Sequence, residues 1–165
     1  MSAQTITRRL TQADLAKLYV AGEKVVMFTA YDASFARLLD GAGVECLLIG
    51  DSLGNVIQGH DTTLPVTVAD IAYHTAAVKR GCDRSFIIAD MPFGSYQESK
   101  EQALRNAVRL LAAGAEMVKL EGGEVMAKAW QINLIALWGW IALSASMGLF
   151  AVVRANGAML APMLI

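Results

Sequence analysis

Short apolar runs alternate with longer amphipathic stretches from Val25 to Gly123, and this alternation restricts the fold more than any other feature of the chain. It is typical of repeated strand–helix units around a parallel sheet. The short runs are continuously apolar, as strands covered on both faces of a parallel sheet require. The predicted strands are 25–30, 46–51, 86–90 and 117–122.

The amphipathic stretches predict helices, and two of them have a clear start signal. Asp32 is placed to cap one helix, and Thr67 to cap another, with Asp70 in the capping-box position. The predicted helices are about 11–20, before the first strand, and then 32–43, 67–81 and 99–115.

Two α/β architectures accommodate four strand–helix units. One is a doubly wound open sheet. The other is part of an eight-stranded (β/α)8 barrel, whose complete form takes about 250 residues. A length of 165 residues favours the doubly wound sheet if the chain is complete, but the pattern of strands and helices is compatible with both.

The composition changes at about Val125. The segment 125–165 contains no acidic residue, and its only basic residues are Lys128 and Arg154. Its uncharged stretch 129–153 is long enough to cross a hydrocarbon core of about 30 Å as a helix. A buried helix and a tail never selected to fold are the other interpretations. We therefore predict a folded domain at 1–124 and an apolar, helical tail at 125–165.

Charge and cysteine patterns exclude several classes of function. The formal net charge is -1, and acidic and basic residues are interspersed, unlike the clustered basic residues of nucleic-acid binders. Cys46 and Cys82 lack a CxxC spacing and partner histidines, so we interpret them as core thiols rather than zinc ligands. The polar N-terminus has no apolar stretch of signal-peptide length, which favours a cytoplasmic protein.

Three of the predicted strands carry a carboxylate at or next to their last residue: Asp51, Asp90 and Glu121. The carboxyl ends of parallel strands meet at one edge, with neighbouring strands about 4.8 Å apart, so we expect the three acids to lie together. A single acid after a strand is more often a solvated turn residue. Three in register favour a site for a hard divalent cation, Mg²⁺ above all, and the absence of His or Cys beside them argues against zinc.

Lys119 lies two residues before Glu121, so both side chains point to the same face of the strand. An ammonium group there is placed to hold a substrate carboxylate or an enolate oxygen. The residues thus predict metal-assisted chemistry on a small oxyacid. His60 falls in a predicted loop and His74 in a predicted helix, and we interpret both as structural.

The chain contains four characteristic stretches, "TAYDASFARLLDGAG", "LLIGDSLGNVIQGHDTTLPVTVADIAYHTAAVKRG", "IIADMPFGSY" and "GAEMVKLEGGE". Together they resemble the 3-methyl-2-oxobutanoate (ketopantoate) hydroxymethyltransferase family, from about Thr5 to Glu124. The resemblance implies a (β/α)8 TIM barrel of the phosphoenolpyruvate/pyruvate-binding type, of which the chain would supply the first four βα units. It also implies transfer of a hydroxymethyl group from the co-substrate 5,10-methylenetetrahydrofolate to 3-methyl-2-oxobutanoate. The product, 2-dehydropantoate, serves pantothenate and coenzyme A synthesis.

The resemblance implies a role for each strand-end residue. Asp51, Asp90 and Glu121 match the Mg²⁺-binding acids of the family. Ser52 and Lys119, together with Asp51 and Asp90, match its 2-oxoacid-binding residues. The catalytic base of the family is a glutamate in a downstream part that we expect this chain to lack, so no catalytic residue is assigned. Family members are cytoplasmic homo-oligomers, typically decamers.

From Val125 on, the chain shows no resemblance to the family. We therefore expect either a hydroxymethyltransferase or a truncated or frameshifted remnant that keeps the Mg²⁺- and oxoacid-binding residues but lacks turnover. A membrane-tethered domain is the third hypothesis, and a membrane contact would be made only through the tail at 129–153.

Overall fold

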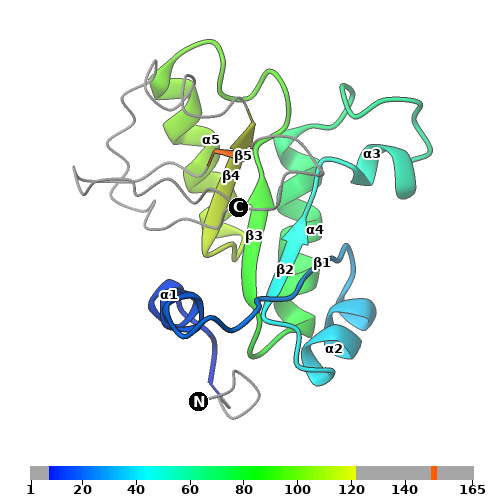
Figure 1. Cartoon of the computed structure of the whole chain (residues 1–165). Helices are drawn as coiled ribbons and strands as arrows, with labels where there is room; N and C mark the ends of the chain where they lie inside the picture. Colours follow the sequence, from blue (N-terminus) through cyan, green and yellow to red (C-terminus); the bar gives the residue numbers. More distant parts are fainter. Residues whose placement is uncertain (1–7, 122–149, 152–165) are drawn as a thin grey trace.

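The structure, a computed structural model, describes residues 8–121 and 150–151. Figure 1 shows its elements coloured along the chain. In chain order they are α1 (Gln12–Val20), β1 (Met27–Thr29), α2 (Ala33–Gly41), β2 (Cys46–Ile49), α3 (Leu53–Val56), α4 (Val68–Gly81), β3 (Phe86–Asp90), α5 (Lys100–Ala112), β4 (Met117–Glu121) and β5 (Phe150–Ala151). Each helix and strand predicted between residues 11 and 122 is present, with shifts of a few residues at its ends.

Side-chain caps begin the helices at the predicted residues. Thr67 and Asp70 form the predicted capping box at the start of α4, and Thr11 and Asp14 form another at the start of α1. Asp32 accepts hydrogen bonds from two backbone N–H groups in the first turn of α2, both at 2.8 Å. Each cap satisfies a backbone donor that has no partner within its own helix.

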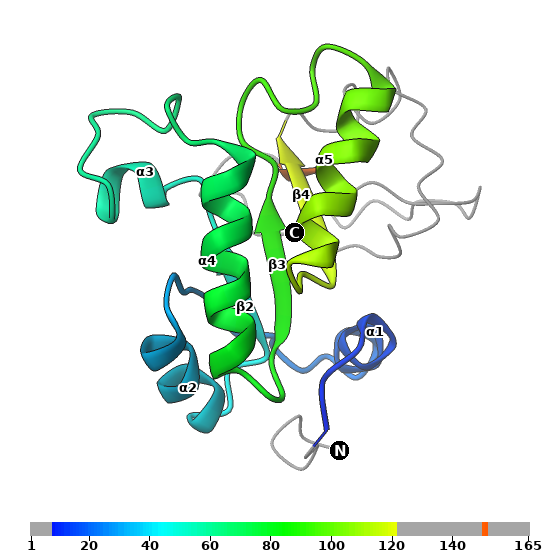
Figure 2. The same cartoon turned by 180° about the vertical axis from the view of Figure 1, so that it is seen from behind.

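The first four strands form a parallel sheet in chain order, and β5 pairs with β4 in the antiparallel direction. The crossover helices share one face of the sheet: α4 and α5 lie behind the strands in Figure 1 and in front of them in Figure 2. A doubly wound sheet has helices on both faces and a reversal in its strand order. That alternative is therefore wrong for the described strands, whose consecutive order matches the strands of a (β/α)8 barrel.

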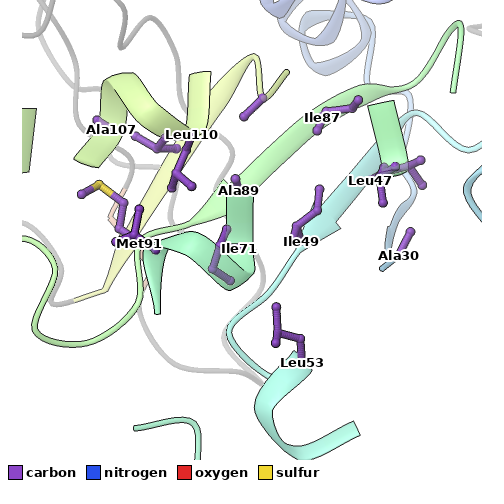
Figure 3. Close-up of a cluster of buried hydrophobic side chains, with 14 of the residues drawn as sticks. Ala30, Leu47, Ile49, Leu53, Ile71, Ile87, Ala89, Met91, Ala107 and Leu110 are labelled. Atoms are coloured by element: carbon purple, nitrogen blue, oxygen red, sulfur yellow. The ribbon is translucent and has the colours of Figure 1, made fainter. Parts of the chain in front are cut away.

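Alternate side chains of the strands form the core beneath α2, α4 and α5. Leu47 and Ile49 of β2 and Ile87 and Ala89 of β3 are completely buried there. Figure 3 shows Ile71, Ala107 and Leu110 of the helices in the same cluster as these strand residues. The helices also contribute Ala36, Leu39 and Val78. Because successive side chains of a strand point to opposite faces, the residues between these core positions belong to the other, inner face of the sheet.

The inner face is covered at its amino-terminal end by α1. Leu15 and Leu18 pack with Cys46, Phe86 and Met117, which are the first residues of β2, β3 and β4. Towards the carboxyl edge this face continues through Ile88 and Asp90 in β3 and through Lys119 and Glu121 in β4. The apolar part of the inner face therefore ends where the polar strand ends begin.

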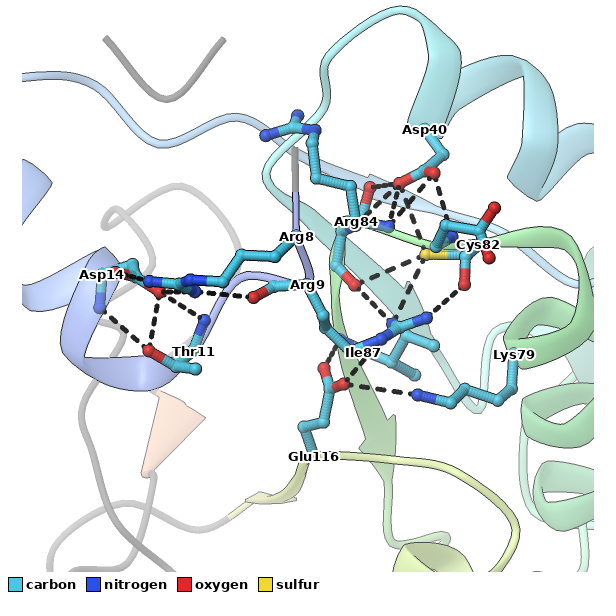
Figure 4. A network of polar contacts seen from close by, with 12 residues as sticks. Arg8, Arg9, Thr11, Asp14, Asp40, Lys79, Cys82, Arg84, Ile87 and Glu116 are labelled. Carbon is cyan, nitrogen blue, oxygen red and sulfur yellow. Dashed lines mark hydrogen bonds and ion pairs between the residues drawn. The ribbon is translucent and has the colours of Figure 1, made fainter. Parts of the chain in front are cut away.

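Polar side chains tie the amino-terminal edge of the sheet together (Figure 4). Arg9 donates hydrogen bonds to the backbone oxygens of Cys82 and Ser85, and its Nε lies 3.4 Å from an oxygen of Glu116. Asp40, near the end of α2, accepts a hydrogen bond of 2.7 Å from the N–H of Ser85. Glu116 also accepts one of 2.7 Å from the backbone of β3. These contacts stabilise the amino-terminal edge of the sheet. Ligands bind at the opposite, carboxyl edge in such sheets.

Both cysteines are buried free thiols, as predicted. Burial raises the pKa of the Cys46 thiol to about 12, and it raises the pKa of Cys82 as well. A thiol whose pKa is raised by apolar surroundings is a poor nucleophile and a poor metal ligand. Both side chains are part of the hydrophobic core.

The edge strand β1 differs from the predicted strand 25–30, which was expected to be covered on both faces. It spans only Met27–Thr29, and Phe28 is 50% exposed. The reason is its position, since among the described strands β1 has a neighbour on one side only. Strand β2 ends at Ile49, before the turn that contains Asp51. The sequence does not predict α3, because four residues are too few to show a helical period.

Most of the predicted tail at 125–165, with the helix at 129–153, lies outside the described residues. Phe150 and Ala151 are in a strand rather than in a helix, and they pair with Glu121 and Leu120. Within 8–121 and 150–151, no helix combines the length and the apolar composition that a membrane span needs. The division of the chain into 1–124 and 125–165 stays a prediction.

Candidate functional site

The structure brings Asp51, Asp90 and Glu121 together at the carboxyl edge of the sheet. One carboxylate oxygen of each lies within 4.8 Å of the others. Asp90 and Glu121 are the last residues of β3 and β4, and Asp51 lies in the turn after β2. The predicted convergence is confirmed, and its cause is that parallel neighbours all end at the same edge.

Lys119 supplies a buried positive charge to these acids. Its Nζ lies 2.7 Å from Asp90 Oδ1 and 3.5 Å from Glu121 Oε1, and its side chain is 5% exposed. Lys119 stands directly beside Asp90 in the register of β3 and β4, so the contact joins neighbouring strands on the inner face. With the acids ionised, three negative charges and one positive charge leave a sum of -2.

Asp90 is the most buried of the three acids, with 3% of its surface exposed. Burial raises the pKa of Asp90 to about 6, although the ion pair with Lys119 and a hydrogen bond of 3.2 Å from the N–H of Asp51 act in the opposite direction. The raised pKa means that the positive charge already present does not fully offset the cost of burial. A cation bound between the acids would favour the ionised form.

Ser52 lies beside the acids, as the resemblance implies. Its Oγ is 2.8 Å from the hydroxyl oxygen of Tyr31, which follows β1. A Cβ atom on Gly50 would lie 2.8 Å from Ser52 Oγ and 3.5 Å from Asp90 Oδ2, so the missing side chain keeps this corner open. We did not predict Tyr31 from the sequence. Tyr31 directly follows the predicted strand 25–30, and the carboxyl ends of parallel strands meet at one edge of the sheet. Its position in the sequence could therefore have predicted that it lies near the acids.

The histidines have structural contacts. His74 Nδ1 lies 2.6 Å from the backbone oxygen of Tyr31, and the two rings meet edge to face with centroids 6.2 Å apart. The backbone oxygen of His60 accepts a hydrogen bond of 2.7 Å from Asn55. In the described part of the chain, neither histidine belongs to the group of acids that could hold a metal ion.

The fold and the site together define a class: an α/β protein with a consecutively ordered parallel sheet that gathers acids and a lysine at the edge where (β/α)8 enzymes place their active sites. The family model described as ketopantoate hydroxymethyltransferase matches residues 9–152. The chain belongs to the ketopantoate hydroxymethyltransferase family. The match extends to residue 152, whereas the characteristic sequence stretches show a resemblance only as far as Glu124.

Curated proteins named 3-methyl-2-oxobutanoate hydroxymethyltransferase are similar to the chain at high identity. That of Dechloromonas aromatica (strain RCB) is 84% identical over 127 residues, which cover 77% of the chain and 47% of the relative. That of Azoarcus sp. (strain BH72) is 62% identical over 119 residues, covering 72% of the chain and 44% of the relative. The chain spans less than half the length of these relatives.

Solved structures share the fold at low identity. Phosphoenolpyruvate phosphomutase from Streptomyces platensis subsp. rosaceus has a TM-score of 0.54 and 19% identity, over 66% of this chain and 37% of that chain. Phosphonopyruvate hydrolase in complex with oxalate and Mg++ has a TM-score of 0.54 and 14% identity, over 66% of this chain and 38% of that chain. At such identities the likeness concerns the fold alone.

Proposed function

We propose that the chain binds Mg²⁺ and 3-methyl-2-oxobutanoate at the carboxyl edge of its sheet. In this proposal the site serves the transfer of a hydroxymethyl group from 5,10-methylenetetrahydrofolate, which gives 2-dehydropantoate. The observation that carries the proposal is the convergence of Asp51, Asp90 and Glu121 within 4.8 Å, beside the buried Lys119, in a member of the ketopantoate hydroxymethyltransferase family.

The donor set suits Mg²⁺. Asp51, Asp90 and Glu121 would hold it through carboxylate oxygens, the ligands that this ion prefers. Histidine and cysteine, which zinc prefers, do not occur in this group within the described residues. The local charge of -2 and the raised pKa of Asp90 both favour the addition of a divalent cation. A protein of the same fold, phosphonopyruvate hydrolase, was solved with oxalate and Mg++, which supports this class of ligand pair.

Lys119 and Ser52 would bind the oxoacid. A 2-oxoacid offers a carboxylate and a keto oxygen, and the Lys119 ammonium, 2.7 Å from Asp90, is placed to attract an anion next to the metal ligands. Ser52 Oγ, held 2.8 Å from the Tyr31 hydroxyl, would hydrogen-bond one substrate oxygen. When bound, Mg²⁺ would stabilise the negative charge that develops on the keto oxygen as the C3 proton leaves.

We further propose that the described parallel strands are the first four of a (β/α)8 barrel within 1–124. Their consecutive order and the shared face of the crossover helices support this. The free edge of β1, where Phe28 is half exposed, would then pair with the strand that closes the barrel. Three further properties are implied only by the resemblance and stay predictions. They are the folate co-substrate, the cytoplasmic location and a homo-oligomer, typically a decamer.

A second candidate function is binding of Mg²⁺ and the oxoacid without turnover. The observation that favours it is the 47% coverage of the Dechloromonas aromatica relative, because about half of that relative has no counterpart in the matched residues. Dehydropantoate formation by the purified chain, with Mg²⁺, oxoacid and methylenetetrahydrofolate supplied, distinguishes the two candidates.

Titration calorimetry tests the binding proposal that the two candidates share. We expect Mg²⁺ and 3-methyl-2-oxobutanoate each to bind more tightly when the other is present, because the oxoacid chelates the ion. Asp51→Ala should abolish this coupling. Asp83→Ala removes an exposed acid at the opposite, amino-terminal edge and should leave it intact. Equal oxoacid affinity in the wild-type chain and Asp51→Ala would contradict the proposal.

A further inference from the structure

The hydroxyl group of Tyr96 makes two hydrogen bonds to the backbone of Glu121. It donates to the carbonyl oxygen at 2.8 Å and accepts from the N–H at 3.2 Å. Tyr96 belongs to the loop between β3 and α5, and it is 3% exposed. The loop that follows one of the candidate metal ligands, Asp90, therefore contacts the backbone of another, Glu121.

The two hydrogen bonds replace a missing strand partner. Residues two apart in a strand direct their backbone N–H and C=O groups to the same neighbour. The oxygen of Lys119 accepts a hydrogen bond of 2.9 Å from the N–H of Met91, at the end of β3. At the level of Glu121 the chain has left β3, which ends at Asp90. The Tyr96 hydroxyl supplies both a donor and an acceptor in that place.

The loop that carries Tyr96 is held by α5. Asn106 donates a hydrogen bond of 2.7 Å to the backbone oxygen of Ser95, and Gln102 donates one of 3.0 Å to that of Gly94. Gly94 has a φ of 84°, a conformation that favours glycine and lets the loop turn back towards β4. The position of Tyr96 is thus set by contacts outside the site.

The ring of Tyr96 is fixed in place, because it is buried in the core beneath the crossover helices. A fixed ring gives Glu121 a rigid backbone anchor.

Glu121 needs such an anchor more than the other acids do. The Asp90 carboxylate is buried, with Lys119 at 2.7 Å and the N–H of Asp51 at 3.2 Å. The Glu121 side chain is 54% exposed, and its distance to Lys119 is 3.5 Å. Little packing restrains it, so control of its position falls to the backbone.

We infer that Tyr96 is a positioning residue: by binding both backbone groups of Glu121, it holds that carboxylate within reach of the cation that Asp51 and Asp90 share. The inference rests on the proposed metal site and deepens it, because it assigns a role to a residue that does not touch the ion.

The test is a double-mutant cycle on Mn²⁺ affinity, measured by electron paramagnetic resonance of free Mn²⁺, since Mn²⁺ accepts the oxygen ligands that suit Mg²⁺. Tyr96→Phe keeps the ring and removes the hydroxyl, and we expect it to weaken Mn²⁺ binding about tenfold, as loss of a ligand-orienting contact commonly does. In the Glu121→Gln background the same change should have no further effect, because Tyr96 acts only through that carboxylate. Tyr19→Phe, at an exposed tyrosine of α1, is the matched control.

The outcomes separate the inference from the proposed function. Equal Mn²⁺ affinity in the wild type and Tyr96→Phe, or an equal loss in both backgrounds, would overturn the positioning role and leave the metal site standing. A wild-type chain that binds no Mn²⁺ would overturn both. If Tyr96→Phe does not fold by circular dichroism, Asn106→Ala loosens the same loop from α5. It should weaken Mn²⁺ binding in the wild type but not in Glu121→Gln, and any other result contradicts the inference.

Discussion

Lys119 Nζ lies 2.7 Å from Asp90 Oδ1, and neither side chain is more than 5% exposed. Two neighbouring strands therefore bury a charged pair at the edge of the sheet where ligands bind. Removing one partner of such a pair leaves an uncompensated charge in the interior. Such a pair is costly for stability, and the proposed binding of a metal and an anionic substrate would account for it.

Lys119→Met is the first prediction. It keeps most of the side-chain volume but leaves Asp90 buried without its cation, so we expect the free energy of unfolding at pH 8 to fall by about 3 kcal/mol. Urea denaturation measures it. The double variant Lys119→Met/Asp90→Leu removes both charges and should recover most of the loss, whereas failure to recover would mean that packing rather than charge explains the effect.

The stability of the metal-free chain should depend on pH through Asp90. Its pKa is raised from the ordinary 3.8 to about 6, first because of burial, so between these values the folded chain binds more protons than the unfolded chain. We therefore expect the free energy of unfolding of the wild type, relative to Asp90→Asn, to decrease as the pH rises from about 4 to about 6. Denaturation in the presence of EDTA measures this difference. An increase over the same range would show that Lys119 dominates and that the Asp90 pKa is lowered.

Gly50→Ala should weaken oxoacid binding with little effect on stability. The added Cβ would lie 2.8 Å from Ser52 Oγ, so the serine must leave its position beside Tyr31. Loss of one oriented hydrogen bond corresponds to an oxoacid affinity about fivefold lower by calorimetry, with a stability change within about 1 kcal/mol. Gly41→Ala is the control, because a Cβ there meets nothing within 4 Å. If Gly50→Ala binds the oxoacid like Gly41→Ala, Ser52 is not a substrate contact.

Gly81→Ala tests the packing of α4 on α2. A Cβ on Gly81 would overlap with the backbone oxygen of Ala33, and backbone cannot move aside cheaply. We expect the free energy of unfolding to fall by about 2 to 3 kcal/mol. Gly41→Ala, also in a helix but facing open space, should be neutral or slightly stabilising. Equal stability of the two variants would contradict the described contact between these helices.

The acids of the site could be predicted from the sequence because their position follows from two local rules. Parallel strands end at one edge, and residues two apart share a face, which places Asp90, Lys119 and Glu121 together without knowledge of any loop. The direct contact of Lys119 with Asp90 needs the register between β3 and β4, which the apolar pattern does not contain.

The contacts made by loops could not be predicted. Tyr31 meets Ser52, and Tyr96 meets Glu121, only because the chain after a strand folds back over the edge of the sheet. Such paths depend on tertiary contacts, for example the hydrogen bond from Asn106 to the loop before α5. The exposure of β1 likewise depends on which strands lie beside it, and not on the apolar residues that it contains.

The central claim is that Asp51, Asp90 and Glu121 hold a divalent cation that the oxoacid chelates, and electron paramagnetic resonance of bound Mn²⁺ tests it most directly. With 3-methyl-2-oxobutanoate carrying ¹⁷O at the keto oxygen, we predict hyperfine broadening of the Mn²⁺ signal in the wild-type chain and in Asp83→Asn. Bound Mn²⁺ should disappear in Asp51→Asn and Asp90→Asn. Protein-bound Mn²⁺ whose signal does not broaden with the labelled oxoacid, or binding that survives in both of those site variants, would contradict the claim.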